Sequence, residues 1–243
     1  MKFYSVQVEE REELGSYTLL RYRWRGPVEP GQFVMARAAG YPITLDPFLA
    51  RPFSFYDYDG TTASLLFEVR GRGTALLDHA STIEVTAPLG KGFRIEPGLG
   101  RAALLGGGIG VAPLKILGRR LDAMGVPHDV FLGFADVESA VVAREFPGTK
   151  VATMDGSTGI HGTVLDSTDT LEDYGAVYAC GPNPMLAAVK LAAGEKGLCQ
   201  LSVEERMGCG NGSCNGCVVP VHGGGYIRSC VEGPVFPAEV LAW

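Results

Sequence analysis

Residues 209–217 read CGNGSCNGC, and a fourth cysteine follows at position 230. Four of the six cysteines therefore lie within 22 residues, so that one loop can wrap several thiolates around a single centre. The spacing C-x4-C-x2-C followed by a more distant cysteine is the plant-type pattern for a [2Fe–2S] cluster. We predict that Cys209, Cys214, Cys217 and Cys230 are the metal ligands of a small C-terminal [2Fe–2S] subdomain over residues 198–243.

Two other uses of clustered cysteines remain open. A structural zinc site also takes four thiolates, but it usually has two well-separated C-x2-C pairs, and only Cys214 and Cys217 form such a pair here. Disulfides belong to secreted chains, and the first residues, MKFYSVQVEE, lack the apolar stretch of a signal peptide. The glycines between the cysteines favour the cluster, because a loop that hugs a cluster needs backbone angles that glycine adopts at least cost.

The length and composition limit which classes of protein this chain can belong to. The chain has 243 residues, of which 46% are hydrophobic, enough for one large or two medium domains with proper cores. No run in the sequence approaches the roughly 20 apolar residues of a membrane span. The net charge of −6 at pH 7 gives no electrostatic footprint for nucleic acid. We expect a soluble cytoplasmic protein with neither a membrane span nor a nucleic-acid partner.

Residues 1–97 contain short strand-like runs separated by turn signals. SYTLLRYRW (16–24) and ASLLFEVR (63–70) are two such runs, and Pro/Gly or Asp-Gly turns divide the series. Six or so strands with little helix predict a small antiparallel barrel. It carries the motifs RPFS (51–54) and GRGT (71–74). A helix starting at Gly73-Thr74 could receive a pyrophosphate, and Arg51 could pair with it, although each motif alone is equally typical of an ordinary strand edge or turn.

Residues 98–197 alternate strands with helices. AALLGGGIGVAPLKILGRRLDAMG (102–125) reads as a buried strand, a glycine turn and an amphipathic helix, and strands follow in HDVFLGF (128–134), KVATMDG (150–156) and AVYACGP (176–182). This alternation predicts a doubly wound parallel sheet that binds a nucleotide. A dinucleotide phosphate would lie at the turn 106–110, and Cys180-Gly181-Pro182 closes another strand of the same sheet. A tight turn without a nucleotide is the alternative.

The loop after the second strand bears on the choice between NAD and NADP. GFADVESA (133–140) offers Asp136 and Glu138 and no basic residue. Acids there would repel the 2′-phosphate of NADP, which favours NAD. The same acids would also serve as cap and first-turn residues of the next helix, and both roles are compatible.

Taken together, the motifs resemble the ferredoxin reductase family over nearly the whole chain and, within it, the iron–sulfur electron-transfer subunits of NAD-dependent (type B) dihydroorotate dehydrogenases. The resemblance is carried by ARPFSF (50–55), GRGT (71–74), LLGGGIGVAPL (104–114), CGPNPML (180–186), EERMGCGNGSCNGC (204–217) and CVEGPVF (230–236). Most of these mark the wider superfamily. The closing EERMGCG…C with GPVF is the most specific to this subunit and its near relatives.

The resemblance implies FAD on the barrel, a [2Fe–2S] cluster, and NAD as co-substrate. FAD would contact Arg51, Pro52, Phe53, Ser54, Leu66, Phe67, Glu68, Gly73 and Thr74, and NAD would lie on Gly106, Gly107, Gly108, Gly110 and Pro113 with Cys180, Gly181 and Pro182 near the nicotinamide. Two departures affect the detail of the FAD contacts: Arg72 stands where the family often has an acid, and Phe53 and Phe55 stand where aliphatic residues are commoner. The implied fold is multi-domain, β plus α/β.

The resemblance also implies a function. NAD exchanges hydride, a cluster carries one electron, and a flavin does both, so FAD must lie between them. The chain would pass electrons from an FMN-containing, dihydroorotate-oxidising catalytic subunit through the cluster and FAD to NAD, in pyrimidine biosynthesis, within a heterotetramer of two plus two subunits. No side chain need act as acid or base. The alternatives are an NADH-linked subunit of a ferredoxin oxidoreductase, sulfide dehydrogenase or hydrogenase complex, and a cluster-based redox sensor.

Overall fold

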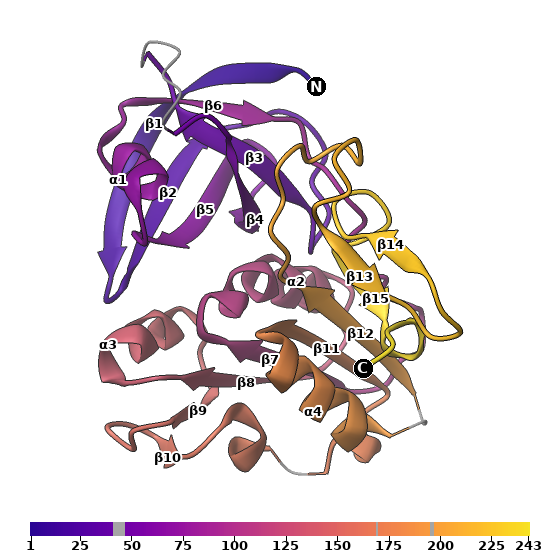
Figure 1. Ribbon diagram of the computed structural model, residues 1–243. Coiled ribbons are helices and arrows are strands. Elements are labelled where there is room, and N and C mark those ends of the chain that lie inside the picture. Colours follow the sequence, from indigo (N-terminus) through magenta and orange to yellow (C-terminus); the bar gives the residue numbers. More distant parts are fainter. Residues whose placement is uncertain (41–46, 169, 195–196) are drawn as a thin grey trace.

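The computed structural model describes residues 1–40, 47–168, 170–194 and 197–243. A closed barrel lies against a seven-stranded sheet, and the C-terminal segment runs alongside both (Figure 1). Within the described residues, no helix is long and apolar enough to cross a membrane.

The barrel is antiparallel throughout, as predicted. Its strands are β1 (Phe3–Leu14), β2 (Tyr17–Arg23), β3 (Phe33–Ala38), β4 (Arg51–Tyr58), β5 (Thr62–Glu68) and β6 (Thr82–Thr86), in the order β1-β2-β5-β4-β3-β6. Side chains alternate between faces along a strand, so on β5 Leu65 and Phe67 pack inside the barrel while Leu66 packs toward the sheet. Helix α1 (Arg72–His79) follows β5 and buries Leu77 in the barrel. β5 therefore presents one face to the second domain.

The sheet is parallel except at one edge, and it is doubly wound as predicted. It contains β7 (Ala102–Gly107), β8 (His128–Phe134), β9 (Lys150–Thr153), β10 (Ile160–His161), β11 (Ala176–Gly181), β12 (Leu198–Val203) and β15 (Val235–Pro237), in the order β10-β9-β8-β7-β11-β12-β15. From β7 the chain moves outward through β8, β9 and β10, and then returns to β11 on the other side. The direction of winding therefore changes between β7 and β11, which is where open α/β sheets bind ligands.

Helices cover both faces of this sheet. They are α2 (Ala112–Ala123), α3 (Val137–Ala140) and α4 (Asn183–Ala193), with short 3-10 helices at Gly108–Val111, Val141–Glu145, Val164–Ser167, Leu171–Asp173 and Ala238–Val240. Because neighbouring residues of a strand face opposite ways, Leu104 packs with α2, whereas Leu105 packs on the α4 side. Helix α2 lies between the sheet and the barrel (Figure 1), where the Arg119 guanidinium donates to both carboxylate oxygens of Asp57 at 2.7 Å.

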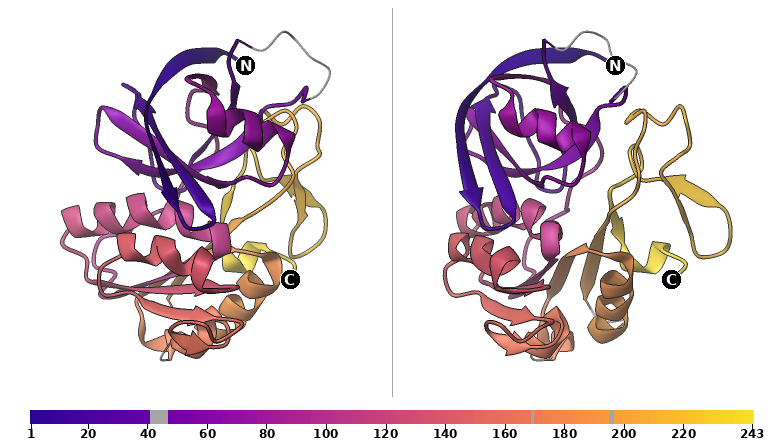
Figure 2. Two further views of the ribbon diagram at one scale, coloured as in Figure 1. Left: turned by 90° about the vertical axis from the view of Figure 1, so that its left-hand side faces the viewer. Right: turned by 60° about the vertical axis from the view of Figure 1, so that its left-hand side comes forward.

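The C-terminal segment is joined to the sheet rather than separate from it. β12 pairs in parallel with β11, and β15 pairs antiparallel with β12. The sequence boundary expected at 197/198 therefore does not coincide with an edge of the sheet, because β12 continues the parallel hydrogen-bond ladder. The cysteine loop and the hairpin of β13 (Val218–Pro220) and β14 (Tyr226–Arg228) project between β12 and β15, beside the barrel (Figures 1 and 2).

A buried glutamine holds the linker between the two domains. The Gln200 side chain on β12 accepts a hydrogen bond from the Arg94 N–H at 2.9 Å and donates one to the Arg94 carbonyl at 2.7 Å. The Tyr178 hydroxyl donates to the same carbonyl at 3.1 Å. These bonds tie the strand-free segment after the barrel directly to β11 and β12 of the sheet.

Replacing Gln200 with leucine should lower the free energy of unfolding by about 1–3 kcal/mol, because the part-buried Arg94 N–H would lose its partner and the Arg94 carbonyl would keep only the Tyr178 hydroxyl. Urea denaturation measures the change. Gln7 lies exposed on β1 and provides the control, for which Gln7→Leu should shift stability by no more than about 0.5 kcal/mol. Equal losses in the two variants would show that Gln200 does not hold the linker.

Candidate functional site

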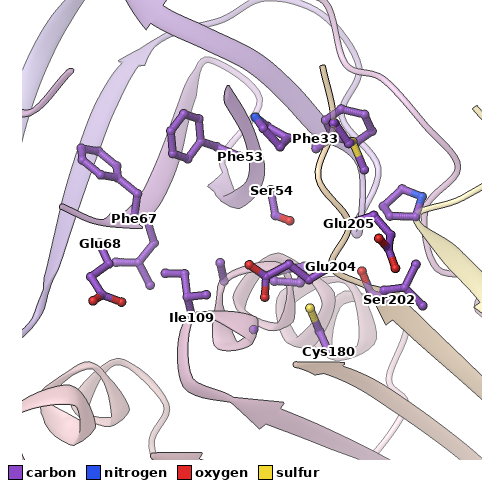
Figure 3. Close-up of a pocket in the computed structure, with 18 of the residues that line it drawn as sticks. Phe33, Phe53, Ser54, Phe67, Glu68, Ile109, Cys180, Ser202, Glu204 and Glu205 are labelled. Atoms are coloured by element: carbon purple, nitrogen blue, oxygen red, sulfur yellow. The ribbon is translucent and has the colours of Figure 1, made fainter. Parts of the chain in front are cut away.

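A cavity of about 200 Å³ lies where the barrel, the sheet and the C-terminal segment meet (Figure 3). Nine of the predicted cofactor-binding residues line it: Pro52, Phe53, Ser54, Leu66, Phe67, Glu68, Gly110, Pro113 and Cys180. The first six come from β4 and β5 of the barrel, and the last three come from the 3-10 helix after β7, from α2 and from β11. Residues predicted from separate motifs thus face one common space.

Three further predicted residues gather at the start of α1. A Cβ atom built on Gly73 would overlap the guanidinium of Arg51, so this side chain reaches from β4 to the first turn of the helix. The Thr74 hydroxyl accepts hydrogen bonds from the N–H groups of Arg70 at 3.0 Å and Gly71 at 3.2 Å. A guanidinium beside a helix N-terminus suits a pyrophosphate. The geometry of Arg51, Gly73 and Thr74 therefore fits the phosphate end of FAD.

The two predicted NAD motifs lie against each other at the switch point of the sheet. Cys180 of β11 pairs with Gly106 of β7. A Cβ on Gly110 would overlap the carbonyl oxygen of Cys180, and one on Gly181 would lie 3.2 Å from the backbone nitrogen of Gly107. Glycine is required for backbones to approach this closely. Residues 106–110 and 180–182 therefore form one surface at the carboxyl ends of β7 and β11, where a dinucleotide fits.

The substitution Gly110→Ala should disturb this surface, because the new methyl group overlaps backbone atoms that cannot rotate away. We expect the free energy of unfolding to fall by about 1–3 kcal/mol and NADH-to-dye activity to fall with it. Gly118→Ala is the matched control: its Cβ would lie 3.3 Å from the His128 ring, and alanine is favoured inside helix α2. Similar losses in both variants would contradict the role given to Gly110.

The structure places the four predicted ligand cysteines in two hydrogen-bonded pairs. The Cys214 N–H donates to the sulfur of Cys209, and the Cys230 N–H donates to the sulfur of Cys217, each at 3.4 Å. All four are free thiols. Among the described residues, no three His, Cys, Asp or Glu side chains converge as they would around one metal ion. Two cysteine pairs suit a [2Fe–2S] cluster, in which each iron takes two protein thiolates, better than a single zinc ion.

The cysteine loop is packed on the barrel on one side and open on the other. Cys217 and Cys230 are buried beside Met35 of β3, whereas Cys214 is exposed. Burial raises the pKa of the Cys209 thiol, but N–H groups of Asn211, Cys214 and Ser213 that point at the sulfur outweigh it and lower the pKa to about 6. The thiolate is the form that binds metal, so the loop backbone favours that form at Cys209, whereas burial raises the pKa of Cys230 to about 12.

Comparison with known proteins agrees with this geometry. Residues 204–242 match the model of the iron–sulfur cluster binding domain of dihydroorotate dehydrogenase B. The chain is 40% identical over 223 residues to the electron transfer subunit of dihydroorotate dehydrogenase B (NAD(+)) of Bacillus caldolyticus, covering 86% of this chain and 85% of that protein. The corresponding subunit of Caldanaerobacter subterraneus subsp. tengcongensis is 37% identical over 232 residues, covering 90% of each. This chain belongs to the family of dihydroorotate dehydrogenase B electron transfer subunits.

Solved structures support the same assignment at the level of fold. The NADH-dependent reduced ferredoxin–NADP oxidoreductase superposes with a TM-score of 0.84 at 26% identity, covering 98% of this chain and 90% of that one. Phthalate dioxygenase reductase superposes with a TM-score of 0.63 at 15% identity, covering 94% of each chain. Membership of the electron transfer subunit family confirms the predicted oxidoreductase class and the predicted set of FAD, [2Fe–2S] and NAD. It thereby favours turnover over the redox-sensor alternative.

Part of the cavity lining was not predicted from the sequence. The unassigned residues include Phe33, Arg70, Ile109, Ser202, Glu204, Glu205, Met207 and Pro234. Two adjacent acids directly after a buried strand were a usable signal, because β12 ends at the same sheet edge as β7 and β11. The acid Asp136 caps α3, where it accepts a hydrogen bond from the Ser139 N–H at 2.9 Å. A contribution of Asp136 and Glu138 to the choice of NAD over NADP stays a prediction.

Cys180 is a buried neutral thiol at the floor of the cavity. Burial raises its pKa to about 12, and the nearby Glu204 carboxylate adds to the rise. A thiol that stays protonated is neither an active nucleophile nor a metal ligand. Cys180 therefore contributes shape to the cavity.

Proposed function

We propose that this chain carries electrons from an FMN-containing, dihydroorotate-oxidising catalytic subunit to NAD, in pyrimidine biosynthesis, with FAD in the cavity and a [2Fe–2S] cluster on Cys209, Cys214, Cys217 and Cys230. The supporting observation is that the barrel, the nucleotide turns and the segment leading into the cysteine loop line one cavity. A flavin at this place supplies the chemistry that connects the others, since it exchanges hydride with a nicotinamide and single electrons with a cluster.

The chain's own residues would hold and shield these groups. Arg51 and the start of α1 would bind the pyrophosphate of FAD, while Leu66, on the face of β5 opposite to Phe67, forms an apolar part of the cavity lining. Gly110, Pro113 and Cys180 would place the nicotinamide on the opposite side. Apolar walls and a neutral thiol exclude water and stray protons from the space between them.

The exposed side of the cysteine loop would meet the partner. Cys214 is exposed, and large apolar side chains near the loop are exposed as well: Phe48 by 60%, Leu49 by 51% and Val231 by 37%. A group of exposed apolar side chains is typical of a protein–protein interface. The partner would therefore approach within a short electron-transfer distance of the cluster. The heterotetramer of two plus two subunits implied by the resemblance is part of this proposal.

Anaerobic titration of the cofactor-loaded chain with NADH tests the role of the cavity. Flavin absorbance should bleach, and the electron paramagnetic resonance signal of the reduced cluster should appear only in protein that retains FAD. Cluster reduction in flavin-stripped protein, or an oxidised cluster beside a fully reduced flavin, would contradict the proposal.

A ferredoxin-linked complex is the second candidate, because the NADH-dependent reduced ferredoxin–NADP oxidoreductase shares this fold over 98% of the chain. Its identity of 26% is lower than the 37–41% of the dihydroorotate dehydrogenase B subunits, which favours the latter as the source of the partner.

A further inference from the structure

The charged side chains of the cavity are mostly acidic. Glu68, Glu204 and Glu205 line it, and Arg70 is the one cation among the described lining residues. The Arg70 guanidinium is already paired with the Glu68 carboxylate at 2.8 Å. Three carboxylates against one guanidinium leave an excess of two negative charges, and this excess resides on Glu204 and Glu205.

Glu204 lies between the elements assigned to the two redox partners, and Glu205 lies beside it in the lining. Figure 3 shows Glu204 between Ser54 of β4, on the flavin wall, and Cys180 of β11, on the nicotinamide side. Both acids directly follow β12, whose ladder with β11 runs from Leu198 to Val203. Their backbone is therefore anchored to the sheet that would hold the nucleotide.

The nicotinamide ring changes charge during the reaction. The ring of NAD⁺ carries a positive charge, and it becomes neutral when it accepts a hydride, which is two electrons and one proton from the reduced flavin. A negative potential at the ring therefore attracts NAD⁺ and does not attract NADH. The pyrophosphate and adenosine are identical in NAD⁺ and NADH, so the electrostatic interaction with the site differs only at the nicotinamide ring.

We infer that Glu204, assisted by Glu205, selects the oxidised nicotinamide, so that the site binds NAD⁺ in preference to NADH. The inference rests on the proposed function, because it needs the nicotinamide beside Cys180. The two acids would thus favour binding of the electron acceptor, NAD⁺, and release of the reduced product, NADH. This suits a subunit that delivers electrons to NAD. A surface acid that is merely solvated would not distinguish the two forms.

The test compares two nucleotides that differ in ring charge. Oxidised holoprotein, with FAD and cluster, is titrated by calorimetry with NAD⁺ and with 1,4,5,6-tetrahydro-NAD, whose ring is neutral and donates no hydride. Glu204→Gln should raise the Kd of NAD⁺ roughly 5- to 10-fold, the size of one screened charge contact near a surface, and that of the neutral analogue less than about 2-fold. Glu205→Gln should act in the same direction. Raising the ionic strength should bring the Kd values of NAD⁺ and the neutral analogue for the wild-type protein closer together.

Glu172→Gln is the matched control, since Glu172 is an exposed acid that precedes the amino end of β11, at the opposite edge of the sheet. It should leave both Kd values unchanged. The inference is overturned if Glu204→Gln and Glu205→Gln raise the Kd of NAD⁺ and of the neutral analogue equally, or if they change neither Kd. Either result leaves the proposed function standing. If wild-type holoprotein binds neither nucleotide, the proposed function fails and the inference fails with it. If Glu204→Gln loses flavin, Glu205→Gln and the wild-type salt dependence decide the question.

Discussion

Replacing Cys214 with serine is expected to remove the [2Fe–2S] cluster while FAD stays bound. Cys214 is exposed and lies outside the cavity, so the barrel and the flavin wall are untouched. Even partners outside the first ligand shell change metal affinity by about 10–100-fold, so loss of a ligand should cost at least about 100-fold in dihydroorotate-dependent NAD reduction. NADH-to-dye activity should persist, because it needs only the nucleotide surface and FAD.

Iron and sulfide content, the cluster signal in electron paramagnetic resonance and the two activities measure this outcome. Cys199→Ser is the control, because Cys199 lies on β12 outside the cysteine loop and should leave the cluster intact. Retention of the full coupled activity by Cys214→Ser would mean that the cluster is not on the electron path. Loss of both activities together with FAD would mean that the cysteine loop shapes the flavin site directly.

The substitution Arg51→Ala should have the opposite pattern, with FAD lost and the cluster retained. The Arg51 guanidinium lies against Gly73 at the start of α1, where the phosphates of FAD would bind. Hydrogen bonds to a charged group contribute about 1.5–3 kcal/mol, so FAD affinity should fall about 10–100-fold. The ratio of flavin to protein after gel filtration measures the loss, and NADH-to-dye activity should return when excess FAD is added.

Arg37→Ala controls for the loss of an arginine on a neighbouring strand. Arg37 lies on β3 and donates to the Glu84 carboxylate at 2.6 Å, away from the cavity lining. It should retain FAD at the wild-type level. Full flavin occupancy in Arg51→Ala at low free FAD would contradict the placement of the pyrophosphate.

The sequence predicted the features that depend on neighbouring residues. The strand run at β5 and the glycine turn after β7 are local patterns, and both formed as expected. The cysteine spacing is also local, and its assignment as a cluster site stays a prediction. Local patterns do not reveal pairings between distant segments. The bond between Gln200 and Arg94 spans 106 residues, and the pairing of β15 with β12 places the two ends of the cysteine segment in the sheet.

The acidic part of the cavity escaped prediction for the same reason. Glu204 and Glu205 were recognised as part of a motif, yet their place depends on β12 joining the sheet beside β11. Once β12 is in the sheet, its carboxyl end must lie at the edge where the other parallel strands end. Glu204 and Glu205, which follow β12, therefore line the cavity independently of the local pattern of the cysteine loop.

The most direct test of the electron path is an assay on the complex purified anaerobically from its native lysate. We predict a co-purifying FMN-containing subunit and NAD reduction that depends on dihydroorotate, with the coupled reaction abolished in the Cys214→Ser complex and its FAD still bound. A chain that holds FAD and a cluster but couples NADH only to a different partner, and never to dihydroorotate, would contradict it.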